Sequence, residues 1–224
     1  MASNLTQVEI NTIINTLSPL RISTFQRATG FSANADVLEI YKWNALASGA
    51  FFSSLHICEI TVRNGVAGAI ERTYGSNWPW NSTFEGSLPQ VPGNQFKPRS
   101  ELIQVRNKMK VGDTGKVIAE LKFAFWCHMF TRRYDGRIWN PHIRKEFPFL
   151  PLHLSDSDGR LLMHQNFDAL RIFRNRIAHH EHIFSQPLID HHQRIKDLIK
   201  WRCNNSSYWL SQWEMVTNVL ANKP

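Results

Sequence analysis

The sequence predicts an all-α protein. Apolar residues recur at spacings of three, four and seven along most of the chain, and no segment alternates apolar and polar residues over more than a few positions. The chain has 224 residues, of which 42% are hydrophobic and 12% aromatic, so it can bury a substantial core and is not mainly disordered. We therefore expect one helical domain over residues 1–224.

The N-terminal extension, residues 1–33, is predicted to contain two short helices at 6–17 and 20–28. Pro19 separates them because proline restricts the residue before it, and Gly30 ends the second helix. Residues 34–74 carry the longest helical signal, and we expect two helices there with a break near Ser48-Gly49 or Ser53-Ser54. Glu59 and Arg63 are four residues apart and are expected to pair on the helix surface.

Residues 75–98 are rich in Gly, Pro, Ser and Asn and predict a long loop anchored by Trp78 and Trp80. Whether this loop is a functional lid or a tolerated insertion stays open. Helices are predicted beyond it, namely a basic helix at 99–110, a central buried helix at 116–130, and two C-terminal helices at 188–201 and 208–220 with Trp209, Trp213 and Val216 inward. Basic and aromatic residues alternate around Arg137 and Trp139, which fits either a stacking surface for single-stranded RNA or a turn with Trp139 in the core.

Residues 161–184 predict one helix of about six turns. Its apolar stripe contains Leu162, Leu170, Phe173, Ile177 and Phe184. Asn175 and His179 are expected on the opposite face, with Arg174 at the flank. An imidazole can take a proton from a 2′-hydroxyl, and a guanidinium can hold the charge that develops on phosphorus.

The spacing of Arg174, Asn175 and His179 resembles that of HEPN-superfamily ribonucleases, which carry Arg, a polar residue and, four to six residues after the Arg, a His. The chain also resembles the Abi-like family of bacterial abortive-infection proteins (AbiD/AbiF type), through RNRIAHHE and the strings at 17–21 (LSPLR), 40–44 (IYKWN), 59–64 (EITVRN) and 112–126 (GDTGKVIAELKFAFW). This resemblance covers nearly the whole chain and implies a HEPN-like helical bundle.

The resemblance further implies a metal-independent endoribonuclease without a cofactor, which acts in phage defence or as a growth-arresting toxin. Arg174, Asn175 and His179 would be catalytic, and RNA would be bound by Arg171, Arg176, Arg63 and Asn64. A homodimer would place two Arg-His sets around one groove, and an antitoxin or small RNA could restrain it. Many HEPN domains only bind, so a non-catalytic RNA-binding or protein-interaction module is the alternative.

A net charge of +8 and a pI near 9.7 favour an anionic partner, nucleic acid first, although a basic protein can also simply be soluble. Cys58, Cys127 and Cys203 are odd in number and widely spaced, which predicts free thiols in a reducing cytoplasm. We expect no signal peptide and no membrane span. A zinc site is also not expected, because the histidines near the motif (His179, His180, His182, His191 and His192) do not form HExxH.

Overall fold

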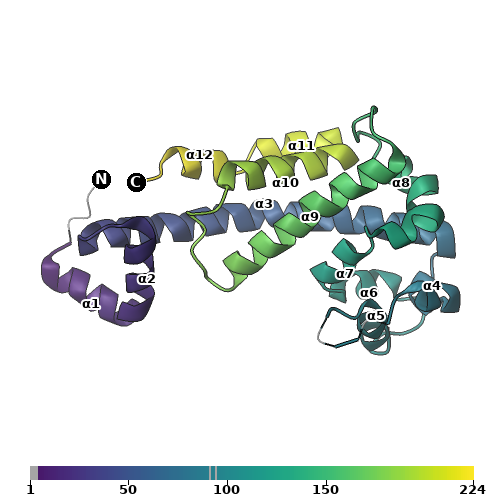
Figure 1. Ribbon diagram of the computed structural model, residues 1–224, viewed down its shortest axis with the longest axis horizontal. Helices are drawn as coiled ribbons and strands as arrows, with labels where there is room; N and C mark the ends of the chain where they lie inside the picture. The colour runs from purple at the N-terminus through teal and green to yellow at the C-terminus, as the bar shows by residue number, and fades with distance from the viewer. Residues whose placement is uncertain (1–4, 91, 94) are drawn as a thin grey trace.

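The computed structural model describes residues 5–90, 92–93 and 95–224, and these residues contain no strand, which confirms the all-α prediction (Figure 1). Residues 1–4 of the predicted extension, and 91 and 94 of the predicted loop, lie outside the described residues. The helices are α1 (Gln7–Leu17), α2 (Pro19–Thr29), α3 (Asn34–Tyr74), α4 (Ser82–Ser87), α5 (Pro98–Arg106), α6 (Thr114–Glu120), α7 (Phe123–His128), α8 (Asn140–Glu146), α9 (Asp156–Ala178), α10 (Leu188–Arg202), α11 (Asn204–Ser211) and α12 (Val216–Ala221).

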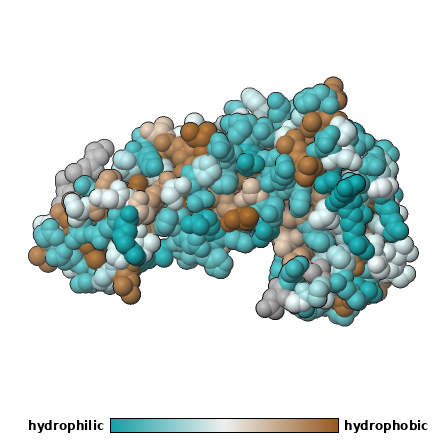
Figure 2. Space-filling model, viewed as in Figure 1, coloured by the Kyte–Doolittle hydropathy of each residue, from teal (hydrophilic) through white to brown (hydrophobic). Residues whose placement is uncertain are grey.

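Helix α3 runs along most of the long axis of the molecule (Figure 1). Helices α1 and α2 lie at one end of it and α4–α7 form a lobe at the other, while α9 crosses it diagonally and α10–α12 lie along it. The surface is hollowed between the α4–α7 lobe and the rest of the molecule (Figure 2). Because α2, α8, α9, α10 and α12 all contact α3, this helix is the central element of the fold.

The prediction of two helices in 34–74 is wrong, because α3 continues unbroken through all 41 residues. The hydroxyl groups of Ser53 and Ser54 donate to the carbonyl of Ala50 at 2.9 and 3.4 Å, so these serines bond within the helix instead of ending it. Phe51 and Leu55, on either side of the serines, are buried against neighbouring helices. Tertiary packing therefore outweighs the low helix propensity of Gly and Ser.

An 18-residue window of α3 has a mean hydropathy of 1.3. By length and composition alone, the helix is therefore long and apolar enough to cross a membrane. The sequence prediction of no such segment was therefore too simple. The same composition is expected of a buried core helix. The contacts of α3 with helices from both the N-terminal and the C-terminal parts of the chain fit that second description.

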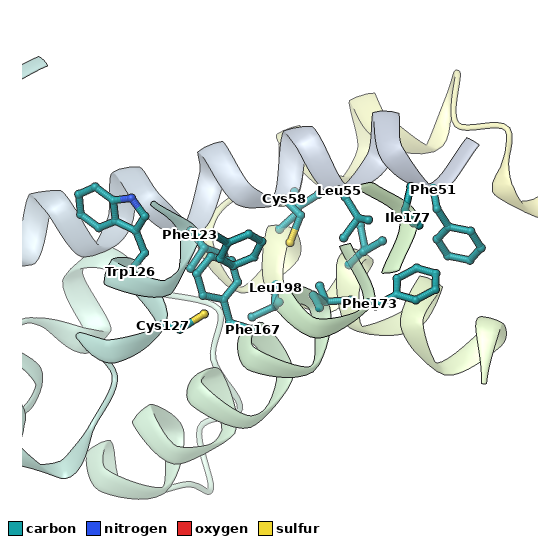
Figure 3. Packing of buried hydrophobic residues seen from close by; sticks show 14 of the residues in the cluster. Phe51, Leu55, Cys58, Phe123, Trp126, Cys127, Phe167, Phe173, Ile177 and Leu198 are labelled. Atoms are coloured by element: carbon teal, nitrogen blue, oxygen red, sulfur yellow. The ribbon is translucent and has the colours of Figure 1, made fainter. Parts of the chain in front are cut away.

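One hydrophobic cluster joins α3 to α7, α9 and α10 (Figure 3). Phe51 of α3 packs edge-to-face on Phe173 of α9, with ring centroids 5.0 Å apart and an angle of 85° between the planes. The ring of Phe123 in α7 packs on that of Phe167 in α9, with the ring centroids 4.4 Å apart. The predicted apolar stripe of α9 is thus largely confirmed, since Leu170, Phe173 and Ile177 are buried and Leu162 is half-buried.

The segment 116–130 was predicted as one helix, which is wrong, because α6 ends at Glu120 and α7 begins at Phe123. Lys122 is extended between them, and the buried carboxylate of Glu101 accepts its backbone N–H at 3.4 Å and its ammonium at 2.8 Å. A side chain 21 residues away therefore decides where this helix breaks.

The predicted helix at 208–220 is divided in a similar way. The Glu214 carboxylate accepts the backbone N–H groups of Val216 and Thr217 at 2.7 and 3.2 Å and so caps α12. Val216 is buried as expected, but Trp209 and Trp213 are 53% and 36% exposed, so their predicted inward orientation is wrong. The prediction for 188–201 is confirmed by α10.

The segment 75–98 is more ordered than a plain loop, since it contains a 3₁₀ turn (Trp78–Trp80) and α4. Trp78 is fully buried as an anchor and Trp80 is half-buried. Trp139 also lies in the core, where its indole N–H donates to the Met129 carbonyl at 2.7 Å and its ring stacks on Phe130 at 4.6 Å. Of the two alternatives for this region, the core turn is the one observed.

The C-terminal end of helix α8 approaches α3 at two glycines, Gly65 and Gly68. A Cβ at Gly65 would lie 2.6 Å from Cζ of Phe147, which is fully buried. One turn on, the buried carboxylate of Glu146 accepts from Nε of Arg72 on α3 at 2.7 Å and from Nη1 of Arg202 on α10 at 2.8 Å. Glycine thus lets α8 bind both helices at once.

We expect Gly65→Ala to lower the free energy of unfolding by about 1–3 kcal/mol, because the Phe147 ring has no room to move. Gly49→Ala in the same helix is the matched control, since nothing lies within 4 Å of a Cβ built there. Alanine has the better helix propensity, so this control should raise stability by up to about 1 kcal/mol. Urea unfolding followed by circular dichroism measures both, and equal stabilities would contradict the close packing.

Candidate functional site

The helix that carries the predicted motif begins and ends earlier in the chain than predicted. Helix α9 ends at Ala178 instead of near Phe184, so the prediction of one helix over 161–184 is wrong at its C-terminus. The N–H of His180 donates to the Ile177 carbonyl and that of Glu181 to the Arg176 carbonyl, both at 2.9 Å. With His180 in the left-handed region at φ 56°, these two bonds form a Schellman motif. His179 is therefore the residue that caps the helix.

The turn after α9 is held by residues from the N-terminal third of the chain. The Arg21 guanidinium of α2 donates to the His180 carbonyl and, through Nε, to the Tyr41 hydroxyl at 2.8 Å. Inside the protein, the Asn44 side-chain oxygen accepts the backbone N–H of Ile183 at 2.7 Å. The strings at 17–21 and 40–44 thus contribute side chains that fix the position of His179.

The arginines of α9 differ in what they bind. Arg160 pairs with Asp135 at 2.8 Å and Arg171 with Asp168 at 2.7 Å. Arg176 pairs with Glu181 at 3.1 Å and donates to the His182 carbonyl at 3.3 Å. Arg174 makes no hydrogen bond within the described part of the chain, and its Nε lies 4.0 Å from Oε2 of Glu59.

Two of the predicted RNA-binding arginines of α9, Arg171 and Arg176, are therefore engaged inside the protein. Arg176 holds the turn that follows α9, which is a structural task. Arg174, with 36% of its side chain exposed, is the arginine of this helix whose guanidinium is available to a ligand.

Arg174 faces a stripe of α3 that contains His56, Glu59 and Arg63. Their spacings of three and four place them on one side of the helix. The predicted surface pair of Glu59 with Arg63 is replaced by an approach of Glu59 to Arg174. Burial raises the pKa of the Glu59 carboxyl, while the nearby positive charges of Arg174, Arg63 and His56 act to lower it. His56 and Glu59 were not assigned to the site from the sequence, although their spacing could have suggested it.

Arg63 also lacks a hydrogen bond among the described residues, and its Nε is buried without a partner. Asn64, the residue after it, is exposed. The structure therefore brings Arg63 and Arg174 to one cavity between α3 and α9, and Asn64 is not among the residues that line it.

His179 lies apart from this cavity. Five residues at about 100° each turn the helix by about 140° beyond a full circle, so Arg174 and His179 point to different sides of the helix end. His179 is exposed, and Asn175 is half-buried on the face between them. One copy of the chain thus places an imidazole and a guanidinium on different sides of one helix end, with an amide between them.

Within residues 5–90, 92–93 and 95–224, no group of three or more His, Cys, Asp or Glu side chains is placed to hold a metal ion. All three cysteines are free, and Cys58 and Cys127 are buried. Burial raises the pKa of both buried thiols, which makes them poor nucleophiles. In comparisons with known proteins, no family model, curated protein or solved structure matches this chain.

The side chain of His180 is exposed and its backbone is left-handed. We expect His180→Gly to raise the free energy of unfolding by about 0.5–1 kcal/mol, because glycine adopts this conformation without strain. His180→Val should lower it by about 1 kcal/mol or more, since a β-branched residue is strained at positive φ. Thermal unfolding distinguishes the two, and equal midpoints would contradict the Schellman geometry.

Proposed function

We propose that this protein binds RNA and cleaves it as a metal-independent endoribonuclease, with Arg174, Asn175 and His179 as its catalytic residues. The proposal rests on the contacts and exposure of Arg174 and His179. Arg174 has no hydrogen bond in the described chain, and His179 is exposed at a helix end that side chains from α2 and α3 hold in place. The resemblance to HEPN ribonucleases supports the assignment of these three positions.

In the proposed reaction, His179 takes the proton of a ribose 2′-hydroxyl as the oxygen attacks phosphorus. The bond from phosphorus to the 5′-oxygen breaks, and an acid returns a proton to that oxygen. The products are a 2′,3′-cyclic phosphate and a 5′-hydroxyl. Arg174 binds a phosphate of the strand through two parallel N–H groups, and Asn175, on the face between Arg174 and His179, orients either the attacked phosphate or the imidazole.

The acid in this scheme is His179 of a second copy. In one copy Arg174 and His179 point to different sides of the helix end, whereas two copies facing each other would place two Arg-His sets around one groove. The outer face of α9 has features of a contact surface, because Ile172 is 52% exposed between polar residues. A homodimer through this face completes the proposed site.

The proposed setting is the cytoplasm, where free thiols such as Cys58 persist. Resemblance to abortive-infection proteins favours a role in phage defence or as a growth-arresting toxin, with an antitoxin or small RNA as the restraint. A non-catalytic RNA-binding or protein-interaction module is the competing function, and the experiment below separates the two.

We expect His179→Ala to lower the rate of RNA cleavage by about 10² to 10⁴, the typical effect of losing a positioned general base, with RNA affinity nearly unchanged. Arg174→Ala should abolish cleavage and also weaken binding, since it removes a phosphate contact. The assay uses purified protein, bulk RNA and excess chelator, with analysis of the product ends. His180→Gly is the control and should cleave normally. If wild type binds RNA without cutting it, the binding-module alternative replaces the enzyme.

We expect the protein to sediment as a dimer, and Ile172→Glu to shift it to monomer, because the substitution buries charge in the proposed contact. Ile189→Glu is the matched control, since Ile189 is 77% exposed and belongs to another helix, α10. Analytical ultracentrifugation over a range of concentrations measures both variants. A wild type that stays monomeric with and without RNA would overturn the two-copy site.

A further inference from the structure

A cavity of about 190 Å³ lies between α3 and α9. It is lined by Phe52, Leu55, His56, Glu59, Ile60, Arg63 and Arg174. A water molecule takes about 30 Å³ of liquid, so the cavity has room for a phosphate group together with a few waters. Its lining combines basic side chains with apolar ones, and the basic ones come from both helices.

The charges of this α3–α9 cavity are unbalanced. Arg63 and Arg174 contribute two positive charges and Glu59 one negative charge, which leaves an excess of one before His56 is counted. Glu59 stands 4.0 Å from Nε of Arg174, too far for a hydrogen bond. Neither guanidinium has a hydrogen-bond acceptor within the described residues.

The buried Nε of Arg63 is the second indication of a ligand. This N–H has no partner in the described chain, although most other arginines bind a carboxylate or a carbonyl oxygen. Arg63 lines the cavity and makes no hydrogen bond among the described residues, so its guanidinium can donate to a ligand there. Phosphate oxygens match the fork of a guanidinium, and two such forks meet at this cavity.

Phe52 forms the apolar part of the rim and is 48% exposed. An exposed aromatic ring beside a phosphate-sized cationic pocket fits one nucleotide, because every base has a face that can stack on it. The ring lies four residues before His56 on the same side of α3.

We infer that the α3–α9 cavity is a nucleotide subsite, which holds one phosphate of a single-stranded RNA between Arg63 and Arg174 and stacks the adjoining base on Phe52. The inference rests on the proposed function for its ligand, RNA. Glu59 attracts both guanidinium groups and competes with the phosphate for them. The subsite lies on one side of α9 and His179 on the other, so the strand crosses the end of the helix.

The test measures binding without cleavage, using a deoxyuridine hexanucleotide that lacks the attacking 2′-hydroxyl. Arg63→Met should weaken binding about tenfold and reduce the slope of log affinity against log salt by about 0.7. Arg132→Met is the matched control, because Arg132 is exposed, lies away from this cavity and carries the same charge. It should change the affinity less than about twofold.

Two further variants separate the subsite from a loss of folding. Glu59→Gln removes the competing charge and should tighten binding by about two- to threefold, a gain that a misfolded variant does not produce. The gain should disappear in the double variant with Arg63→Met. Phe52→Ala should weaken binding of the hexanucleotide by about fivefold or more and leave the binding of inorganic phosphate unchanged.

Equal losses in Arg63→Met and Arg132→Met would overturn the subsite, since net charge alone would then explain binding. Inorganic phosphate or uridine 5′-monophosphate bound as tightly as the hexanucleotide would also overturn it in favour of a free-anion site. If the variants change hexanucleotide binding as expected but the wild type does not cleave RNA, the proposed ribonuclease function is rejected and the subsite is not. Conversely, cleavage that depends on His179 while Arg63→Met has no effect would reject the subsite alone.

Discussion

The rest of the structure depends on the close packing of α8 against α3. Gly65 and Gly68 remove the side chains that would keep the two helices apart, and the buried Glu146 carboxylate is then reached by Arg72 of α3 and Arg202 of α10. A buried carboxylate is stable only when its charge is compensated, so this arrangement accepts little variation in the spacing of the three helices. Helix α9 packs on α3, α8 and α10. The positions of these three helices therefore set the distance between α9 and the side of α3 that contains His56, Glu59 and Arg63.

The second constraint is the turn that carries His179. It is not regular structure, and in isolation it would be free to move. Arg21 donates to the His180 carbonyl and to the Tyr41 hydroxyl, and Asn44 accepts the N–H of Ile183. The helix end is therefore held by α2 and the first half of α3. The strings at 17–21 and 40–44 contain these residues, and their place in the structure gives them a physical role. They position a candidate catalytic residue without lying in the site themselves.

The charge of the protein has two different uses. A net charge of +8 favours an anionic partner, yet most of the arginines whose contacts are described neutralise internal carboxylates or cap helix ends. Arg63 and Arg174 differ from these, because neither makes a hydrogen bond within the described chain. Both belong to the α3–α9 cavity, so the proposed ribonuclease surface and the nucleotide subsite share one helix, α9, and use its two sides.

The sequence by itself determined what depends on neighbours within about four residues. The helical class, the bounds of α1, α2 and α10 and the apolar stripe of α9 follow from periodicity, caps and Pro or Gly punctuation. Arg174 and His179 were identified through resemblance to a motif. Only the tertiary structure decided that α3 stays unbroken, that Lys122 interrupts the next predicted helix and that Glu59 lies nearest Arg174. The physical reason is distance along the chain, because Glu101 bonds Lys122 across 21 residues and Asn44 bonds Ile183 across 139, and no local pattern records such contacts.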